Sequence, residues 1–166
     1  MQTATVPTPA GPFTIVAEAE SGTVLASGWT DDADVLVALI APALRPAALE
    51  HVDHLGSVTD AVAAYVDGDL GAVDRVVVHQ ESGPFLMEAW SVLRQVPAGA
   101  PVTYAELAAK AGRPDAVRAA ASACARNAAA LFVPCHRVVR TGGGLGGFRW
   151  GLDVKSWLLD HEAPGA

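Results

Sequence analysis

The sequence predicts an α+β protein made of two lobes, residues 1–82 and 83–166. Short apolar runs between turn signals in the first half are typical of strands, whereas the second half shows helix caps and apolar residues at helical spacing. The charge divides at the same place, because the first half carries two Lys and Arg against twelve Asp and Glu, and the second carries nine against six. This asymmetry favours an acidic lobe joined to a lobe that binds anions.

The first lobe is expected to contain a hairpin and two helices. Residues 1–12 are rich in Thr and Pro and predict a loose terminal tail. Strands are predicted at 13–19, 23–29 and 75–79, and helices at 30–40 and 57–66. The segment Glu81-Ser82-Gly83-Pro84 combines Gly with Pro and marks the boundary between the lobes.

The second lobe is expected to be all helical. Helices are predicted at 85–96, 103–111, 115–126 and 154–161. Thr103 caps the second of these, with Glu106 completing a capping box, and Pro114 should stand near the first position of the third. The short turn between them contains Gly112, which is the pattern of a helix-turn-helix.

The third of these helices indicates contact with the minor groove of DNA. It is rich in alanine and lacks the Asn, Gln or Lys that would read base edges. We therefore expect Ala119 and its neighbours to approach the groove closely, with Arg118 reaching furthest. Nearby arginines would neutralise phosphates, among them Arg126, Arg137 and Arg140. An Ala-rich helix packed inside a bundle, with a scatter of solvated arginines around it, is the alternative explanation.

A cysteine in the stretch Val133-Pro134-Cys135-His136-Arg137 is the candidate nucleophile. Pro134 restricts its own φ and favours an extended Val133, so the thiol stands on a stiff turn. A neighbouring histidine and cationic groups lower the pKa of a thiol and activate it. A half-buried structural cysteine is the alternative, but polar residues crowded against the thiol inside an apolar run favour the nucleophile.

Two other motifs lead to weaker hypotheses. His51, Asp53, His54 and His79 could ligate a metal, but no cysteine joins them, so solvated histidines are favoured and no metal is expected. Glycines 142, 144 and 147 match G-x-G-x-x-G, yet no βαβ unit surrounds them, so no dinucleotide cofactor is expected. They would instead let the backbone lie against a flat ligand beside Phe148.

The sequence shows neither a membrane segment nor a secretory signal. No run approaches the ~18 apolar residues that a membrane span needs. Two cysteines, Cys124 and Cys135, are too few for a disulfide framework and suit a reducing cytoplasm.

Several motifs of the second lobe occur together at a specific spacing. Residues 133–139, Val-Pro-Cys-His-Arg-Val-Val, follow Arg118 and Asn127 and precede Gly-Phe-Arg-Trp-Gly at 147–151 and Lys-Ser-Trp-Leu-Leu-Asp-His-Glu at 155–162. This combination resembles the O6-alkylguanine-DNA alkyltransferase family, and its bacterial adaptive-response and Ogt-type members in particular. The resemblance implies an RNase H-like first lobe and a simple or winged helix-turn-helix in the second.

The resemblance also implies stoichiometric repair of O6-alkylguanine in double-stranded DNA. Cys135 would accept the alkyl group irreversibly, His136 would take the thiol proton through a water, and Glu162 would orient His136. Tyr104 would give a hydrogen bond or proton to the leaving guanine, which eases its departure. Asn127 would be the hinge between the recognition helix and the cysteine turn.

The lesion must leave the base stack, because the thiol cannot reach it inside a duplex. Arg118 would fill the gap that the flipped nucleotide leaves. The pocket would also draw on Val133, Pro134, Phe148, Arg149 and Trp150. The protein is expected to be a monomer, and whether O4-alkylthymine is a further substrate stays open.

Three departures separate this chain from the family pattern. Phe148 stands where tyrosine is usual and loses a hydroxyl, and Ala128 stands where proline or lysine is common, which loosens the hinge. The N-terminal cysteines that bind zinc in some animal members are absent. Two other functions are considered: a lesion-binding module without transfer, in which Cys135 would be replaced, and a regulator whose cysteine senses damage.

Overall fold

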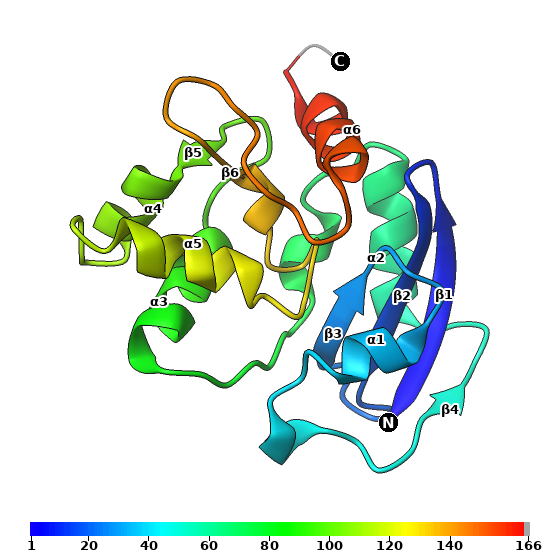
Figure 1. The fold of residues 1–166 in the computed structure, drawn as a ribbon. Helices are drawn as coiled ribbons and strands as arrows, with labels where there is room; N and C mark the ends of the chain where they lie inside the picture. The colour runs from blue at the N-terminus through cyan, green and yellow to red at the C-terminus, as the bar shows by residue number, and fades with distance from the viewer. Residues whose placement is uncertain (165–166) are drawn as a thin grey trace. The chain divides into compact units, whose positions relative to one another are not determined.

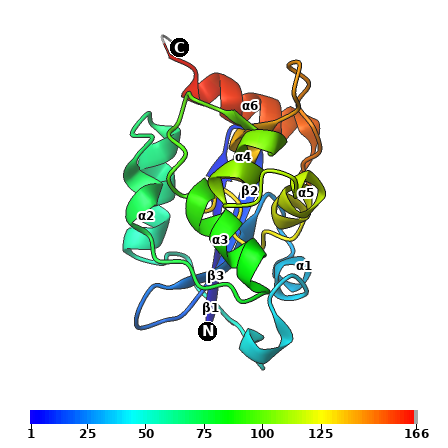
Figure 2. The same ribbon diagram turned by 90° about the vertical axis from the view of Figure 1, so that its left-hand side faces the viewer.

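The computed structural model describes residues 1–164 and divides into two compact units (Figures 1 and 2). The first unit comprises Met1–Gln80 together with Ala128–Phe132, and the second comprises Glu81–Asn127 and the chain from Val133 onward. The chain therefore leaves the second unit after Asn127, contributes a short segment to the first, and returns just before Cys135.

A four-stranded sheet of order β3-β2-β1-β4 forms the centre of the first unit. β1 (Gln2–Thr8) pairs antiparallel with β2 (Gly11–Ala17), which pairs antiparallel with β3 (Val24–Gly28). The short strand β4 (Glu50–His51) runs parallel to β1. Figure 1 shows β1, β2 and β3 side by side in shades of blue. β2 and β3 are the most buried of these strands and provide much of the core.

β1 shows that the expectation of a loose tail at residues 1–12 is wrong. Its prolines suggested an irregular backbone, but Pro7 lies opposite Pro12 at the turn end of the hairpin, where a missing N–H interrupts little of the ladder. Thr3 and Ala4 are buried. Pairing with β2 along the whole strand, which no local pattern reveals, orders this segment.

The strand predicted at 75–79 is also wrong. Ala72–Arg75 form a 3₁₀ helix, η2, and the apolar residues that follow make an isolated bridge between Val78 and Val24. Two backbone hydrogen bonds hold them, from Val24 N to Val77 O at 2.8 Å and from His79 N to Val24 O at 3.0 Å. The segment lies beside β3, but its pairing is too short to form a regular strand.

The helices of the first unit begin close to where the sequence predicts. α1 (Ala33–Val37) is capped by Asp32, whose side chain accepts a hydrogen bond from the backbone of Asp34. It ends earlier than predicted, and a 3₁₀ helix, η1 (Pro42–Leu44), follows it. α2 (Ser57–Val66) has the predicted bounds and buries Val58, Thr59, Val62 and Tyr65.

The segment Ala128–Phe132 lies beside β3, where Ala129 forms an isolated bridge with Ser27. Ser27 N donates to Ala128 O at 2.8 Å, Ala130 N donates to Ser27 O at 3.2 Å, and Ser27 Oγ donates to Ala130 O at 2.7 Å. Leu131 within it has a φ of 75°, a left-handed conformation that strains a residue with a Cβ. These contacts hold the segment that leads from Asn127 to the cysteine turn.

The second unit is helical apart from two short strands. Its elements are α3 (Pro84–Leu93), β5 (Val102–Thr103), α4 (Tyr104–Lys110), α5 (Val117–Ala125), the 3₁₀ helix η3 (Cys135–Arg137), β6 (Val138–Val139) and α6 (Leu152–Glu162). The predicted all-helical lobe thus needs a correction, because β5 and β6 pair in parallel. The helix after Pro114 also begins later than predicted, because Arg113 and Ala116 close a turn before α5.

α4 and α5 form the predicted helix-turn-helix. Thr103 and Glu106 complete the capping box of α4, as predicted. Ala120 and Ala123 of α5 pack inside the unit, while Arg118 is exposed. Contact of α5 with the minor groove stays a prediction. The indole Nε1 of Trp90 on α3 donates to the carbonyl of Ala123 at 2.9 Å. The small buried face of α5 lets α3 and α4 pack closely against it.

The α+β fold class predicted from the sequence is confirmed, with a small sheet and helices in the first unit and a helix-turn-helix in the second. Among residues 1–164, no helix is long and apolar enough to cross a membrane.

The contact between Ser27 and residues 128–132 can be tested by mutation. Ser27→Ala should lower the free energy of unfolding by about 1–3 kcal/mol, because the buried carbonyl of Ala130 loses its hydroxyl partner. Urea unfolding of the full chain measures this. Ser21→Ala, at an exposed turn, is the matched control and should change stability by less than about 0.5 kcal/mol. Equal effects of the two substitutions would contradict this account.

Candidate active site

The candidate nucleophile lies at the start of a short 3₁₀ turn. Pro134 precedes η3, Cys135 N donates to Val133 O at 2.8 Å, and Arg137 N donates to Pro134 O at 3.0 Å. β6 follows at once and pairs with β5 just before α4, so the turn is held on both sides. Only 8% of Cys135 is exposed.

Asn127 ties the end of α5 to this turn. Its buried Nδ2 donates to Val133 O at 2.8 Å and to Cys135 Sγ at 3.3 Å. Burial raises the pKa of the Cys135 thiol, although the Asn127 hydrogen bond and the charges of Lys155 and Arg149 act in the opposite direction. The resting sulfur is therefore a protonated thiol, which needs a base before it can attack.

A buried ionic cluster stands directly behind the cysteine. Glu162 Oε2 accepts hydrogen bonds from His136 Nε2 at 2.8 Å and Arg137 Nη2 at 3.0 Å, and Oε1 accepts one from Arg137 Nε at 2.9 Å. Arg137 Nη1 also donates to Val96 O at 2.8 Å. Burial alone would raise the pKa of Glu162, but these hydrogen bonds and charges outweigh it and lower the pKa from 4.5 to about 2. The carboxylate is thus ionised at neutral pH.

The same cluster determines which nitrogen of His136 is basic. Burial lowers the pKa of His136, and the hydrogen bond and charge of Glu162 oppose this shift. A neutral imidazole beside a carboxylate donates from the nitrogen that faces it, so Nε2 carries the proton and Nδ1 is the free base. Nδ1 is buried and has no hydrogen-bond partner within residues 1–164. It is the one ring atom of His136 able to receive a proton.

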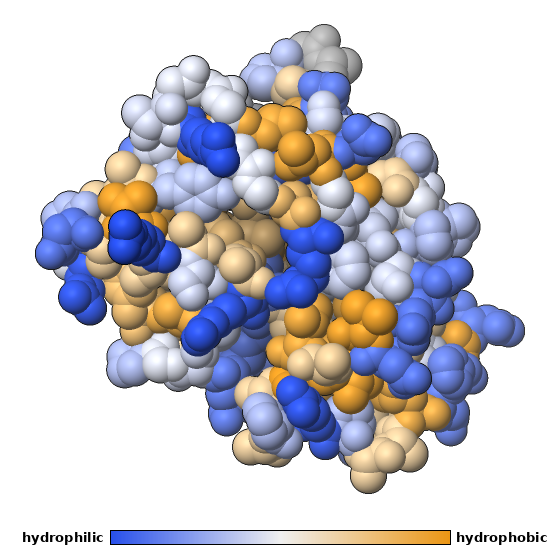
Figure 3. Space-filling view, in the orientation of Figure 1, coloured by the Kyte–Doolittle hydropathy of each residue, from blue (hydrophilic) through white to orange (hydrophobic). Residues whose placement is uncertain are grey.

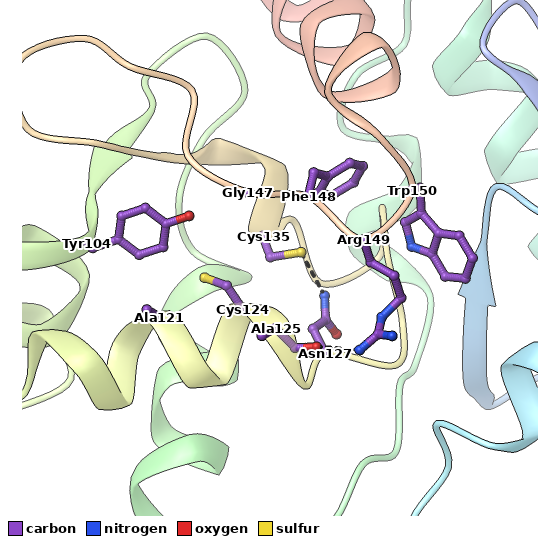
Figure 4. A pocket seen from close by; sticks show the side chains of 10 residues that line it. All are labelled: Tyr104, Ala121, Cys124, Ala125, Asn127, Cys135, Gly147, Phe148, Arg149 and Trp150. Carbon is purple, nitrogen blue, oxygen red and sulfur yellow. Dashed lines mark hydrogen bonds between the residues drawn. The ribbon is translucent and has the colours of Figure 1, made fainter.

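A cavity of about 530 Å³ opens in front of the thiol (Figure 4). Its walls come from α4, α5, the cysteine turn and the segment before α6. The lining residues are Tyr104, Ala121, Cys124, Ala125, Asn127, Cys135, Gly147, Phe148, Arg149 and Trp150. Small side chains on α5 face aromatic ones on the opposite wall, which suits a flat ring system.

Tyr104 brings a hydroxyl to this cavity. Burial and the neighbouring Cys124 and Cys135 raise the pKa of the phenol, so it stays protonated near neutral pH and can donate. Gly146 lies against it: a Cβ at this position would stand 2.7 Å from the Tyr104 hydroxyl oxygen, and the φ of Gly146 is +76°. Glycine is therefore required here both for backbone conformation and for space.

The structure brings most of the predicted pocket residues together. Phe148, Arg149 and Trp150 line the cavity, whereas Val133 and Pro134 are buried and lie outside its lining. Arg137, predicted to contact DNA, is a correction: only 3% of it is exposed, and its guanidinium is held by Glu162 and Val96. A buried guanidinium with these partners cannot reach a phosphate.

The other predicted DNA-contacting arginines are accessible. Arg118, Arg126 and Arg140 are exposed, and Ala119 is half-buried. Arg149 is exposed too, although its Nη2 donates to Ala125 O at 2.7 Å. Figure 3 shows pale, weakly hydrophobic surface over α5 with dark blue, hydrophilic residues beside it. This is the surface expected of a thin helix flanked by arginines.

Three of the lining residues were not predicted from the sequence: Ala121, Cys124 and Ala125. They lie at positions i, i+3 and i+4 of α5 and therefore share one helix face, which was a usable signal. The histidines considered for metal binding lie elsewhere, and His54 Nε2 contacts Asp60 Oδ1 at 3.0 Å. Within residues 1–164, no group of three or more His, Cys, Asp and Glu could hold a metal ion.

Known proteins share both the sequence and the fold. The DNA binding domain profile of 6-O-methylguanine DNA methyltransferase matches residues 84–164. The chain is 52% identical over 79 residues to the bifunctional transcriptional activator/DNA repair enzyme Ada of Escherichia coli, covering 48% of this chain and 22% of that protein. A variant of the O6-methylguanine methyltransferase of Mycobacterium tuberculosis has a TM-score of 0.78 and 26% identity, covering 99% of this chain and 94% of that one.

A further relative is similar over almost its whole length. The methylated-DNA–protein-cysteine methyltransferase of Salmonella typhimurium is 35% identical over 159 residues, which is 95% of this chain and 92% of that protein. The chain therefore belongs to the methylated-DNA–protein-cysteine methyltransferase family.

Proposed function

We propose that this protein repairs O6-alkylguanine in double-stranded DNA by transferring the alkyl group to Cys135. The observation that carries the proposal is a thiol at the wall of a cavity, backed by a neutral histidine and an ionised glutamate. The Salmonella typhimurium relative is named for methyl transfer between methylated DNA and a protein cysteine, and the Escherichia coli relative is named a DNA repair enzyme. Of the two cysteines, Cys135 is the one that directly precedes His136 in the chain.

The chemical step moves one alkyl group from guanine O6 to Cys135 and the thiol proton to His136. Cys135 Sγ attacks the alkyl carbon, the carbon–O6 bond breaks, and the thiol proton passes to His136 Nδ1 through a water. The guanine that leaves would carry a negative charge, so Tyr104 donates a proton or hydrogen bond to it. Glu162 stabilises the imidazolium that forms and fixes the tautomer that can act as base.

The product explains why each molecule acts once. A thioether is chemically stable, and the cavity lining contains no carboxylate or imidazole that would activate water for its removal. The alkyl group also replaces the proton on the sulfur next to Asn127. The protein is therefore consumed by the lesion that it repairs.

DNA binding in this proposal depends on α4 and α5. α5 lies in the minor groove, where its small side chains allow close approach, and Arg118 occupies the space of the extruded nucleotide. Arg126, Arg140 and Arg149 are accessible to phosphates. Since α5 has almost no side chain able to read base edges, binding should depend little on sequence.

The chain is proposed to act as a monomer on its lesion. Cys124 and Cys135 are free thiols, as transfer requires, which fits a reducing compartment such as the cytoplasm.

The acceptor can be tested directly. Cys135→Ser should lose transfer completely while DNA affinity stays within about twofold, because an alcohol is a far weaker nucleophile near neutral pH. Intact-mass analysis after mixing with an O6-methylguanine oligonucleotide detects the gain of one methyl group. Cys124→Ser is the matched control and should still be methylated. A methyl group on the Cys135→Ser protein would refute the assignment, and its mapping to Cys124 would relocate the acceptor.

His136 depends on Glu162 to act as the base. Glu162→Gln should slow single-turnover transfer roughly 100-fold, the low end of what acid–base catalysis contributes, with little change in DNA affinity.

The effect of Glu162→Gln on stability at low pH gives a second measurement. The ionised Glu162 stabilises the fold above pH 4.5, and this contribution, on the order of 3 kcal/mol, is lost as pH falls from 4.5 to about 2. Urea unfolding between pH 5 and pH 3 should therefore show a smaller pH dependence in Glu162→Gln, and an unchanged rate would remove Glu162 from the relay.

Extrusion of the lesion can be separated from chemistry. Arg118→Ala should slow repair of a lesion in duplex DNA about tenfold or more, because unstacking a base costs a few kcal/mol that this side chain offsets. Reaction with free O6-benzylguanine needs no flipping and should change less than about twofold. If both substrates lose activity equally, Arg118 supports the fold and not the extruded state.

A further inference from the structure

The backbone of Ala128, the residue after Asn127, is held on both sides within the first unit. Its N–H donates to the side-chain Oε1 of Gln80 at 2.9 Å, and its carbonyl accepts from Ser27 N at 2.8 Å. Only 3% of Ala128 is exposed. A buried backbone N–H without a partner costs free energy, so the Gln80 oxygen stabilises this conformation of the chain.

This contact joins two places at which the chain passes between the units. Gln80 ends the first part of the first unit, and Ala128 begins its second part, Ala128–Phe132. The two residues lie forty-eight positions apart in the sequence, so no local pattern brings them together. One side-chain hydrogen bond therefore holds the point at which the chain enters the first unit again after α5.

Asn127 carries the effect of this contact to the active site. Its Nδ2 donates to Val133 O at 2.8 Å and to Cys135 Sγ at 3.3 Å, and the second bond is drawn in Figure 4. Both bonds require one orientation of the Asn127 side chain. The peptide unit between Asn127 and Ala128 is planar, so holding its N–H also holds the backbone rotation of Asn127 that precedes it.

The Asn127 donor matters most while the thiol of Cys135 loses its proton. A hydrogen bond to an ionised acceptor is roughly twice as strong as one to a neutral group, so this contact strengthens as the thiolate forms. An interaction that strengthens on the way to the transition state raises the rate of the reaction. Displacement of a positioning group by about 1 Å can lower a rate by two orders of magnitude.

Alanine at position 128 gives Gln80 its donor. Proline is common here in the family pattern, and a proline ring restricts φ but has no N–H to donate. Alanine leaves this backbone freer and supplies an N–H. The hydrogen bond to Gln80 is thus a restraint on the hinge in a chain that has no proline ring at this position.

We propose that Gln80 is a positioning residue for alkyl transfer, which holds the peptide unit between Asn127 and Ala128 so that the Asn127 side chain stays directed at Cys135. This inference rests on the proposed role of Cys135 as acceptor. Gln80 lies outside the lining of the cavity, so its effect on the reaction passes through Asn127.

The experiment compares Gln80→Met, Gln80→Glu and wild type as full-length chains, with a duplex oligonucleotide that contains O6-methylguanine. Gln80→Met keeps the length of the side chain and removes the acceptor, whereas Gln80→Glu keeps an acceptor oxygen. Gln95→Met makes the same change at an exposed glutamine and is the control. The measurements are amide hydrogen exchange at Ala128 by NMR, the single-turnover rate at saturating duplex, and the affinity for the duplex.

In Gln80→Met, amide exchange at Ala128 should accelerate at least about tenfold, because its acceptor is gone. The single-turnover rate at saturating duplex should fall about tenfold, while the affinity for the duplex stays within about twofold because no DNA-contacting group is changed. Gln80→Glu should stay within about twofold of wild type in both exchange and rate, since a carboxylate accepts the same hydrogen bond. Gln95→Met should match wild type.

The variant Ala128→Pro makes the test specific to this hydrogen bond. Proline at position 128 has no N–H, so Gln80 loses the donor that it holds. Gln80→Met should therefore change the rate of the Ala128→Pro protein by less than about twofold. Should Ala128→Pro fail to fold, the comparison of Gln80→Met with Gln80→Glu decides through rate and exchange.

Three results would overturn the inference. The first is an unchanged rate in Gln80→Met, with or without faster exchange at Ala128. The second is faster exchange spread evenly over both units, which would mean general destabilisation. The third is an equal loss of rate from Gln80→Met in wild type and in Ala128→Pro. Failure of wild type to gain a methyl group at Cys135 would instead refute the proposed function, and exchange at Ala128 would then still report whether Gln80 holds this peptide unit.

Discussion

The buried contact of Glu162 with His136 and Arg137 is the interaction on which the rest of the site depends. Cys135 is a protonated thiol in its resting state, because burial raises its pKa, so it requires a base. His136 can be that base only if Nδ1 is unprotonated, and Glu162 secures this by accepting from Nε2. The hydrogen bonds from His136 and Arg137 in turn keep Glu162 ionised, as the lowered pKa of Glu162 indicates.

Burial of the thiol has a second consequence, which is protection. A thiol with a raised pKa reacts slowly with oxidants and stray electrophiles, since the thiolate is the reactive form. The Asn127 hydrogen bond and the nearby positive charges reduce the penalty of forming the thiolate once a substrate occupies the cavity. A protein that can react only once benefits from a nucleophile that stays unreactive until an alkylated base is bound.

Local patterns predicted much of the second unit. The capping box at Thr103 and Glu106 forms as expected, because both partners lie within one helical turn. Predictions failed where the deciding partner lies elsewhere in the chain. Pairing with β2 orders β1. Glu162, twenty-five residues after Arg137, holds the Arg137 guanidinium in the interior and away from the predicted DNA-binding surface. Periodicity and composition describe neighbours in sequence, and these two outcomes depend on neighbours in space.

The sequence by itself predicted the candidate nucleophile, the helix-turn-helix and the division of charge, because motifs and composition can be read without knowing contacts in space. Only the tertiary structure decided which polar groups meet behind Cys135. It placed Glu162 against His136, Lys155 against the carbonyl of Val138, and Ala128–Phe132 beside β3 of the first unit. The physical reason is that a buried charge is tolerated only with specific partners, and packing of the whole unit selects those partners.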